Sequence, residues 1–464
     1  MSNDINKDLD RFSRLVNVFL KSEKNNPVSR FITPSKLTEG IDVSLDYNGV
    51  SAEVLDKILE KIMLISPKSS SSLFFNQLYG GRHSKAVLGD LLSIIINNSM
   101  ATFKISGVHS LLEKEVVTRV SKLIGYDQDF GGTLPTGGSM SNFMSIVIAR
   151  DKVNKTIPQK GIVPNLVAYT SENAHYSISK NASFIGLGKL NVRYIKSNNR
   201  GQINIEELKK QIEEDISKGL IPFYLNATAG TTVLGAYDNI KELAIVCKKN
   251  KIWLHVDGAF GGTVIFSKKL KFLLDGINQS DSFCFNAHKT LGAPISSSIF
   301  LVKNKKYLNT SFNNDASYLY QTEDEDYNLG QTSFECGRKN NALKIWTLWK
   351  SIGDKGMSEI VEHNFGLAEE ARKYIRSNKD YTLHSFENSL SICFNYKDYD
   401  PRDLCTKLYK HSKIMVGFGQ FQNFFFIRLV TVNSQNQTLD IVNFFKVLEK
   451  FAKENENNIK RRSS

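Results

Sequence analysis

Two short runs of the sequence end near side chains that can do covalent chemistry together. Asp257 follows the apolar residues 252–256, which are typical of a buried strand, and Lys289 comes shortly after a similar run at 283–285. Ligands of open α/β sheets bind at the carboxyl ends of the strands. A lysine there can form a Schiff base with an aldehyde, and a buried aspartate can keep a pyridine nitrogen protonated. The pair indicates a pyridoxal phosphate site, although either residue alone is more often an ordinary surface group.

A glycine-rich segment at residues 131–139 is a candidate phosphate site. It leads into a predicted helix whose apolar residues share the spacing of one buried face, namely Met140, Phe143, Met144, Val147 and Ile148. Free backbone N–H groups and the helix dipole favour a phosphate at such a helix start. A glycine-rich turn without a helix behind it would indicate only a loop.

Strand-like and helix-like patterns alternate through the middle of the chain, which predicts a largely parallel sheet covered by helices. The predicted strands include residues 166–169, 223–225, 252–256, 283–285 and 299–302. We predict three parts: a helical amino-terminal arm at 1–84, a large cofactor-binding domain at 85–350, and a smaller α+β domain at 351–464.

The composition excludes several classes of protein. With 464 residues, 41% hydrophobic and 23% charged, the chain is expected to be globular. The net charge of +13 is scattered in small clusters, so nucleic-acid binding is not expected. No long apolar run or signal-like start is present, which favours the cytoplasm over a membrane. None of the five cysteines has metal-ligand spacing to another cysteine or histidine, so we expect reduced thiols and no metal.

Six motifs occur in an order and spacing that resemble the group II pyridoxal-phosphate-dependent amino-acid decarboxylases, most closely the glutamate and cysteine-sulfinate enzymes. They are Gly-Gly-Ser-Met-Ser-Asn at 137–142, Ser-Glu-Asn-Ala-His-Tyr-Ser at 171–177, Ala-Thr-Ala-Gly-Thr-Thr at 227–232, His-Val-Asp at 255–257, Asn-Ala-His-Lys at 286–289 and Cys-Gly-Arg at 336–338. The resemblance implies a fold-type I, aspartate aminotransferase-like α/β enzyme. It also implies a homodimer with shared active sites that converts an L-amino acid to an amine and carbon dioxide.

The resemblance also implies roles for single residues. Lys289 would bind the aldehyde of pyridoxal 5'-phosphate, Asp257 would pair with its pyridine nitrogen, and His175 would stack on its ring. Further cofactor contacts would come from Gly138, Ser139, Thr228, Ala259, Asn286 and His288. Arg428 would hold the substrate carboxylate with help from Gln77 and Ser99, unless it forms a structural ion pair instead.

Tyr318 matches the position of the tyrosine that returns a proton to the substrate carbon in these enzymes, and Tyr320 lies close enough in sequence to be confused with it. A proton donor there favours an amine over an aldehyde product. The neighbouring polar and acidic run at 321–328 suits a lid.

Two departures from the glutamate decarboxylase pattern leave the substrate open. Ala-Thr-Phe-Lys at 101–104 stands where those enzymes have Phe-Thr-Tyr-Glu, and Tyr-Gly-Gly at 79–81 replaces Ser-Thr-Gly. Polar groups at 98–104 could still accept an acidic side chain, so glutamate, aspartate or cysteine sulfinate is the first expectation. The alternatives are a diamino or aromatic amino acid, an aldehyde-forming oxidative decarboxylation, a transamination, or a protein that binds the cofactor without catalysis.

Overall fold

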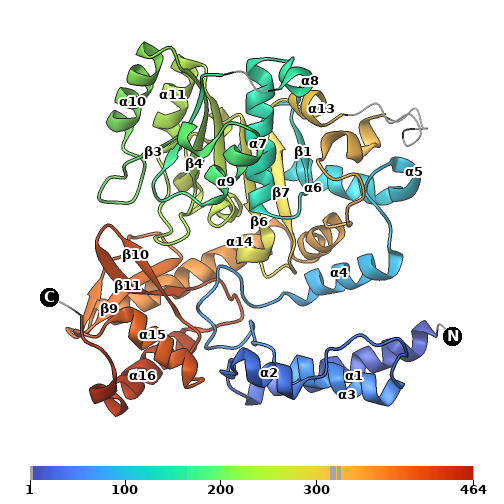
Figure 1. The fold of residues 1–464 in the computed structure, drawn as a ribbon, viewed down its shortest axis with the longest axis vertical. Coiled ribbons are helices and arrows are strands. Elements are labelled where there is room, and N and C mark those ends of the chain that lie inside the picture. The colour runs from blue at the N-terminus through green and yellow to red at the C-terminus, as the bar shows by residue number, and fades with distance from the viewer. Residues whose placement is uncertain (1–3, 162–163, 314–319, 321–324, 463–464) are drawn as a thin grey trace. The chain divides into compact units, whose positions relative to one another are not determined.

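A computed structural model describes residues 4–161, 164–313, 320 and 325–462 of the chain (Figure 1). The fold divides into two compact units. The small unit comprises Met1–Gly81, Glu370–His384 and Ile392–Ser464, and the large unit comprises Arg82–Glu369 and Ser385–Ser391. The three-part division drawn from the sequence stays a prediction.

The large unit is built on a seven-stranded sheet with the order β1-β7-β6-β5-β4-β2-β3. The pairs from β3 through β2, β4 and β5 to β6 are parallel, and β7 pairs antiparallel with both β6 and β1. The strands are β1 Gly131–Thr133, β2 Leu166–Ser171, β3 Val192–Ile195, β4 Ile221–Thr228, β5 Trp253–Gly258, β6 Ser282–Asn286 and β7 Ser298–Val302. This mostly parallel sheet confirms the predicted α/β class. Every residue of β2, β5, β6 and β7 is buried, which explains why their sequences are mostly apolar and lack an alternation of apolar and polar residues.

Helices cover the sheet of the large unit, as Figure 1 shows. The helix α7 contacts β4, β5, β6 and β7, while α10 and α11 pack on β4 and α6 packs on β1 and β7. The helices are α4 Ser84–Ile96, α5 Phe103–Ser106, α6 Val108–Ile124, α7 Gly138–Val153, α8 Ile157–Lys160, α9 Ser177–Phe184, α10 Ile205–Ser217, α11 Ile240–Asn250, α12 Ala287–Thr290 and α13 Lys306–Phe312. Short 3-10 turns lie at η1 Lys189–Asn191, η2 Gly262–Phe266, η3 Lys271–Leu274, η4 Ile277–Gln279, η5 Glu325–Tyr327 and η6 Leu329–Thr332.

The long helix α14, Ala342–Arg376, is interrupted at Gly353, whose φ of 64° lies in the left-handed region that glycine adopts most easily. Among the described residues, no helix combines the length and the apolar character needed to cross a bilayer.

The small unit carries a four-stranded sheet with the order β10-β11-β9-β8. Its strands are β8 Tyr381–Leu383, β9 Ser391–Tyr396, β10 Gly417–Phe421 and β11 Phe424–Val430. Its helices are α1 Ile5–Asn25, α2 Pro34–Gly40, α3 Ala52–Ile65, α15 Pro401–Lys410 and α16 Thr438–Glu454, with a 3-10 turn at η7 Glu456–Asn458. The helix α15 packs on β10, β11 and α16. A smaller α+β region at the carboxyl end is therefore confirmed.

Candidate active site

The start of α7 lies against the carboxyl ends of β5 and β6 at Gly138. A Cβ atom on Gly138 would lie 2.9 Å from the Cβ of Ala259 and 3.2 Å from Nδ2 of Asn286. Asn286 itself is held by Ser298, whose hydroxyl donates to Oδ1 at 2.7 Å. Only a residue without a side chain fits so close an approach. The predicted contacts Gly138, Ala259 and Asn286 are therefore brought together around the first backbone N–H groups of a helix, where a phosphate is favoured.

Asp257 lies near the end of β5 and is buried, with its carboxylate against Asn142 of α7. Its Cα partners are Thr228 on β4 and Cys284 on β6. The backbone N–H of Ala259 donates to Oδ1 at 3.0 Å, and Nδ2 of Asn142 donates to Oδ2 at 2.8 Å. The Sγ of Cys284 lies 3.9 Å from Oδ1, whereas Oδ2 keeps a further lone pair, so the carboxylate can still accept a proton-bearing nitrogen.

Lys289 lies in the single-turn helix α12, directly after β6, and its side chain is half-buried. Burial lowers the pKa of its amine, and the charge of Asp257 opposes that shift in part. A lowered pKa raises the fraction of neutral amine near pH 7, and the neutral amine is the form that attacks an aldehyde.

Two histidines flank this region, and burial favours the uncharged form of both. His175 lies between β2 and α9, and its Nδ1 accepts hydrogen bonds from the hydroxyl of Ser177 at 2.8 Å and from the Ser177 N–H at 3.3 Å. Burial lowers the pKa of His175, an effect that Asp257 opposes and Lys289 reinforces. Burial and Lys289 lower the pKa of His288 to about 4, and Nδ1 of His288 accepts from the Ser297 N–H at 3.0 Å.

The remaining predicted residues are placed as follows. Ser139 is the second residue of α7, and its carbonyl accepts a hydrogen bond from Nδ2 of Asn181 at 3.0 Å. Ser99 belongs to the large unit and is half-buried, and its hydroxyl accepts from the Ala101 N–H at 3.3 Å. Tyr318 lies outside the described residues. The alternative, Tyr320, has its hydroxyl close to Gly330, where an added Cβ would lie 2.9 Å from it.

Arg428 and Gln77 belong to the small unit. Arg428 lies on β11, where burial lowers its pKa, and its Nη2 donates to the carbonyl of Asn76 at 2.9 Å. The exposed Gln77 directly follows Asn76. The two predicted substrate groups are thus neighbours within one unit.

Five buried residues beside the site had no predicted role. Asn142, Ser177 and His255 occur inside the motifs, and Trp253 and Ser282 lie beside them on β5 and β6. One signal was available, because Trp253, His255 and Asp257 alternate along β5 and must face the same side of the sheet.

These features together fit pyridoxal phosphate. A glycine cradle at the start of a helix suits the phosphate, and a buried carboxylate that accepts hydrogen bonds suits the ring nitrogen. A half-buried lysine with a lowered pKa suits the aldehyde.

The pyridoxal-dependent decarboxylase conserved domain matches residues 34–397 of the 464-residue chain. The chain belongs to this family. It is therefore a lyase that decarboxylates an amino acid with pyridoxal 5'-phosphate as its cofactor. The activity and cofactor predicted from the motifs are confirmed.

Individual relatives support this assignment over most of the chain. The acidic amino acid decarboxylase GADL1 of Xenopus tropicalis is 34% identical over 385 residues, which cover 82% of this chain and 75% of that protein. The cysteine sulfinic acid decarboxylase of Homo sapiens is 32% identical over 448 residues, or 91% of this chain and 90% of that protein. A crystal structure of mouse CSAD superposes with a TM-score of 0.91 at 29% identity and covers 96% of this chain and 99% of that chain. The fold-type I prediction is confirmed.

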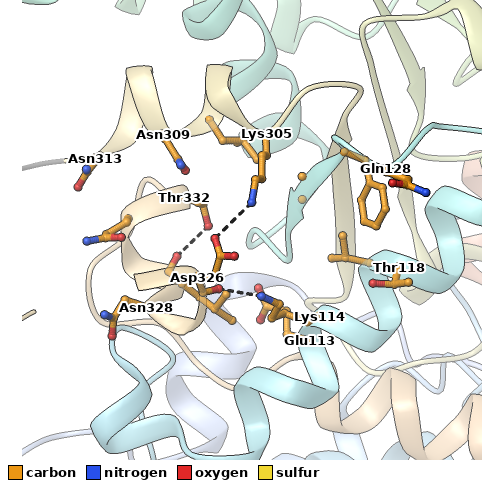
Figure 2. Close-up of a pocket in the computed structure, with 17 residues that line it drawn as sticks. Glu113, Lys114, Thr118, Gln128, Lys305, Asn309, Asn313, Asp326, Asn328 and Thr332 are labelled. Carbon is orange, nitrogen blue, oxygen red and sulfur yellow. Dashed lines mark hydrogen bonds and ion pairs between the residues drawn. The ribbon is translucent and has the colours of Figure 1, made fainter. Parts of the chain in front are cut away.

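A separate cavity of about 290 Å³ lies between α6, β1, α13 and the turns η5 and η6 (Figure 2). Asp326 is contacted from two sides, with Nζ of Lys305 3.3 Å from its Oδ1 and Nζ of Lys114 donating to its carbonyl at 3.0 Å. None of the predicted site residues is among the described residues that line this cavity.

Proposed function

We propose that this enzyme decarboxylates an acidic L-amino acid of the glutamate, aspartate or cysteine-sulfinate kind to the corresponding amine and carbon dioxide. The observation that carries the proposal is the similarity, over 82% and 91% of the chain, to relatives named for acidic amino acids and cysteine sulfinic acid. The polar segment 98–104 supplies further support, because it holds the half-buried Ser99 and the exposed Lys104.

Three side chains of the large unit would work on the cofactor. Lys289 would bind its aldehyde, a role supported by the lowered pKa of the amine. Asp257 would accept a hydrogen bond from the ring nitrogen, supported by the burial and the fixed orientation of its carboxylate. His175 would lie on the ring as an uncharged imidazole. When bound, pyridoxal phosphate supplies an electron sink for the carbanion that the loss of carbon dioxide leaves.

The remaining assignments are part of the same proposal. Contacts to the cofactor would come from Gly138, Ser139, Thr228, Ala259, Asn286 and His288. Arg428, with Gln77 and Ser99, would bind the substrate, since a guanidinium group pairs with a carboxylate through two parallel hydrogen bonds. Tyr318 would return the proton to the substrate carbon.

We also propose a cytoplasmic homodimer with shared active sites. Large apolar side chains are exposed on helices of both units, including Phe12, Val54, Leu55, Leu92 and Ile94. On α4 alone Leu88, Leu92, Ile94, Ile95 and Ile96 are exposed, and a cluster of apolar side chains usually marks an interface between proteins. All five cysteines are free, as in a reducing compartment. Light scattering should give twice the monomer mass of 52.3 kDa.

Matched substrate pairs test the proposed substrate class. The cofactor-loaded enzyme should release carbon dioxide and amine in equal amounts from glutamate, aspartate or cysteine sulfinate, and much less from glutamine and asparagine, which have similar shapes without the charge. Lys289→Ala provides the blank. Preference for a diamino or aromatic amino acid would refute the acidic substrate, and aldehyde with ammonia in place of the amine would indicate the oxidative reaction.

A further inference from the structure

A continuous path of hydrogen bonds runs from Trp253 in the sheet to both Asp257 and His175. Nε1 of Trp253 lies 2.9 Å from the hydroxyl of Ser282, which lies 2.9 Å from Nδ1 of His255. Nε2 of His255 lies 3.0 Å from Oδ1 of Asn142.

At Asn142 the path divides into two branches. Nδ2 of Asn142 donates to Oδ2 of Asp257 at 2.8 Å and to the hydroxyl of Ser177 at 3.0 Å. The Ser177 hydroxyl lies 2.8 Å from Nδ1 of His175. One amide group therefore contacts both branches.

The two ends of the path fix its direction. An indole N–H can only donate and a carboxylate can only accept, so the amide nitrogen of Asn142 must face Asp257. The amide oxygen of Asn142 then faces His255, and Nε2 of His255 must carry the proton that bonds to it.

The other hydrogens follow from these two constraints. Ser282 accepts from Trp253 and gives its own hydrogen to Nδ1 of His255. Asn142 uses one amide hydrogen on Asp257 and the other on Ser177. The Ser177 hydroxyl therefore donates to Nδ1 of His175, which leaves the proton of that neutral imidazole on Nε2.

Burial of these side chains leaves only one arrangement of hydrogens that satisfies every donor and acceptor of the path. The side chains of Trp253, Ser282, His255, Asn142 and Ser177 are all 0–1% exposed, so water does not compete for their hydrogen bonds. Burial lowers the pKa of His255 to about 4, which keeps its ring neutral with a single ring proton to place. A buried polar group that loses its partner carries the full desolvation cost, so a reversed link would be expensive.

We propose that Trp253, Ser282, His255 and Asn142 are positioning residues that set the hydrogen-bonding state of both site side chains. They hold Asp257 as an oriented acceptor, and through Asn142 and the Ser177 hydroxyl they reinforce the Nε2–H tautomer of His175, which the Ser177 backbone N–H favours as well. The consequence for catalysis rests on the proposed roles of Asp257 and His175, whereas the hydrogen positions do not depend on the function.

The hydrogen positions can be observed directly. Neutron crystallography of the full-length deuterated enzyme should place the ring deuterons of His255 and His175 on Nε2. In Asn142→Leu, His255 loses its acceptor, and its deuteron should move to Nδ1 and face Ser282. Ser145→Ala is the control, because the hydroxyl of this buried serine bonds Tyr224 and the backbone carbonyl of Asn142 but no side chain of the path, and both tautomers should be unchanged.

Cofactor binding supplies the second readout and does not depend on a crystal of the variant. His255→Gln keeps an N–H donor toward Asn142, whereas His255→Leu removes it. The dissociation constant of pyridoxal phosphate should stay within about 3-fold of wild type in the glutamine variant and rise about 10-fold to 100-fold in the leucine variant, the range for a hydrogen bond to a charged group.

A deuteron on Nδ1 of either wild-type histidine, or equal cofactor binding by the two His255 variants, would overturn the proposal. Predicted tautomers in an enzyme that decarboxylates no acidic amino acid would support this inference and refute the proposed function.

Discussion

Glu113 and Arg338 are 225 positions apart in sequence and form a two-pronged ion pair, with Arg338 nitrogens 2.6 and 2.7 Å from the two carboxylate oxygens. Their side chains are only 1% and 3% exposed. Arg338 ends the Cys-Gly-Arg motif at 336–338, for which the sequence suggested no role. Because Glu113 lies in α6 and Arg338 lies just before α14, the ion pair links these two segments.

Breaking this pair should destabilise the fold. Arg338→Met leaves the Glu113 carboxylate buried without its partner, and we expect a loss of about 3–5 kcal/mol in the free energy of unfolding. Arg119→Met, in the half-exposed pair with Asp354, is the control and should cost less than about 1 kcal/mol. Urea denaturation of both variants measures the difference. Equal losses would mean that the buried pair adds no special stability.

The close approach at Gly138 predicts that an alanine there weakens cofactor binding more than an alanine at Gly137 does. Gly138→Ala forces a Cβ against Ala259 and Asn286, so the dissociation constant of pyridoxal phosphate should rise at least about 10-fold. A Cβ on Gly137 meets nothing within 4 Å, and its φ of 170° suits any residue, so Gly137→Ala should bind almost normally. Fluorescence titration compares the two. Similar constants would remove Gly138 from the phosphate site.

Turnover should depend on the negative charge of Asp257 more than on the size of its side chain. Asp257→Asn keeps the shape but removes the negative charge that supports a protonated ring nitrogen, so turnover should fall by at least ~2 orders of magnitude. Asp238→Asn is the control for the loss of a buried negative charge elsewhere in the large unit. The carboxylate of Asp238 accepts hydrogen bonds from the backbone N–H groups of Thr228 and Ile203. Steady-state rates on the best substrate measure both. Near-normal turnover in Asp257→Asn would make Asp257 structural.

The lowered pKa of Lys289 predicts how the apoenzyme recaptures its cofactor. Only the neutral amine attacks the aldehyde, so the rate should rise with pH around a midpoint below the ordinary lysine value of 10.5. Because Asp257 raises the pKa of Lys289, Asp257→Asn should move the midpoint to still lower pH. Stopped-flow absorbance gives both profiles. A midpoint at or above the ordinary value would contradict the burial argument.

The proposed proton donor decides which product forms. Tyr318→Phe removes only a hydroxyl, and it should reduce the amine and, in air, yield some aldehyde and ammonia. Tyr320→Phe is the matched variant and should keep equal amounts of amine and carbon dioxide. Measurement of amine, aldehyde and carbon dioxide distinguishes the two variants. If Tyr320→Phe forms the aldehyde and Tyr318→Phe does not, Tyr320 is the proton donor.

The sequence predicted the central strands well because they are buried on both faces. The predicted strand at 283–285 is one residue shorter than β6 at each end, and the predicted strand at 299–302 starts one residue after β7. In contrast, residues 131–133 had only a loop-like glycine pattern, and the structure makes them the edge strand β1. Glycine is needed there because a Cβ on Gly132 would lie 2.7 Å from Val117, a contact between distant segments that no local pattern reveals.

Only part of the site is visible in the sequence. Lys289 and Asp257 have chemically distinctive side chains and follow strands, so their types and spacing were informative. Trp253 and Ser282 have no distinctive chemistry in this motif pattern, and their importance depends on the register that pairs His255 with Ser282 across β5 and β6. That register is a tertiary property, and so the path of hydrogen bonds emerged only from the structure.

Borohydride trapping identifies the lysine that carries the cofactor, which we expect to be Lys289. Reduction of the loaded enzyme, followed by peptide mapping, should place one pyridoxyl group per chain on Lys289 and none elsewhere, and Lys289→Ala should retain no label. A pyridoxyl group mapped to another lysine, or a wild-type enzyme that retains none, would contradict the account.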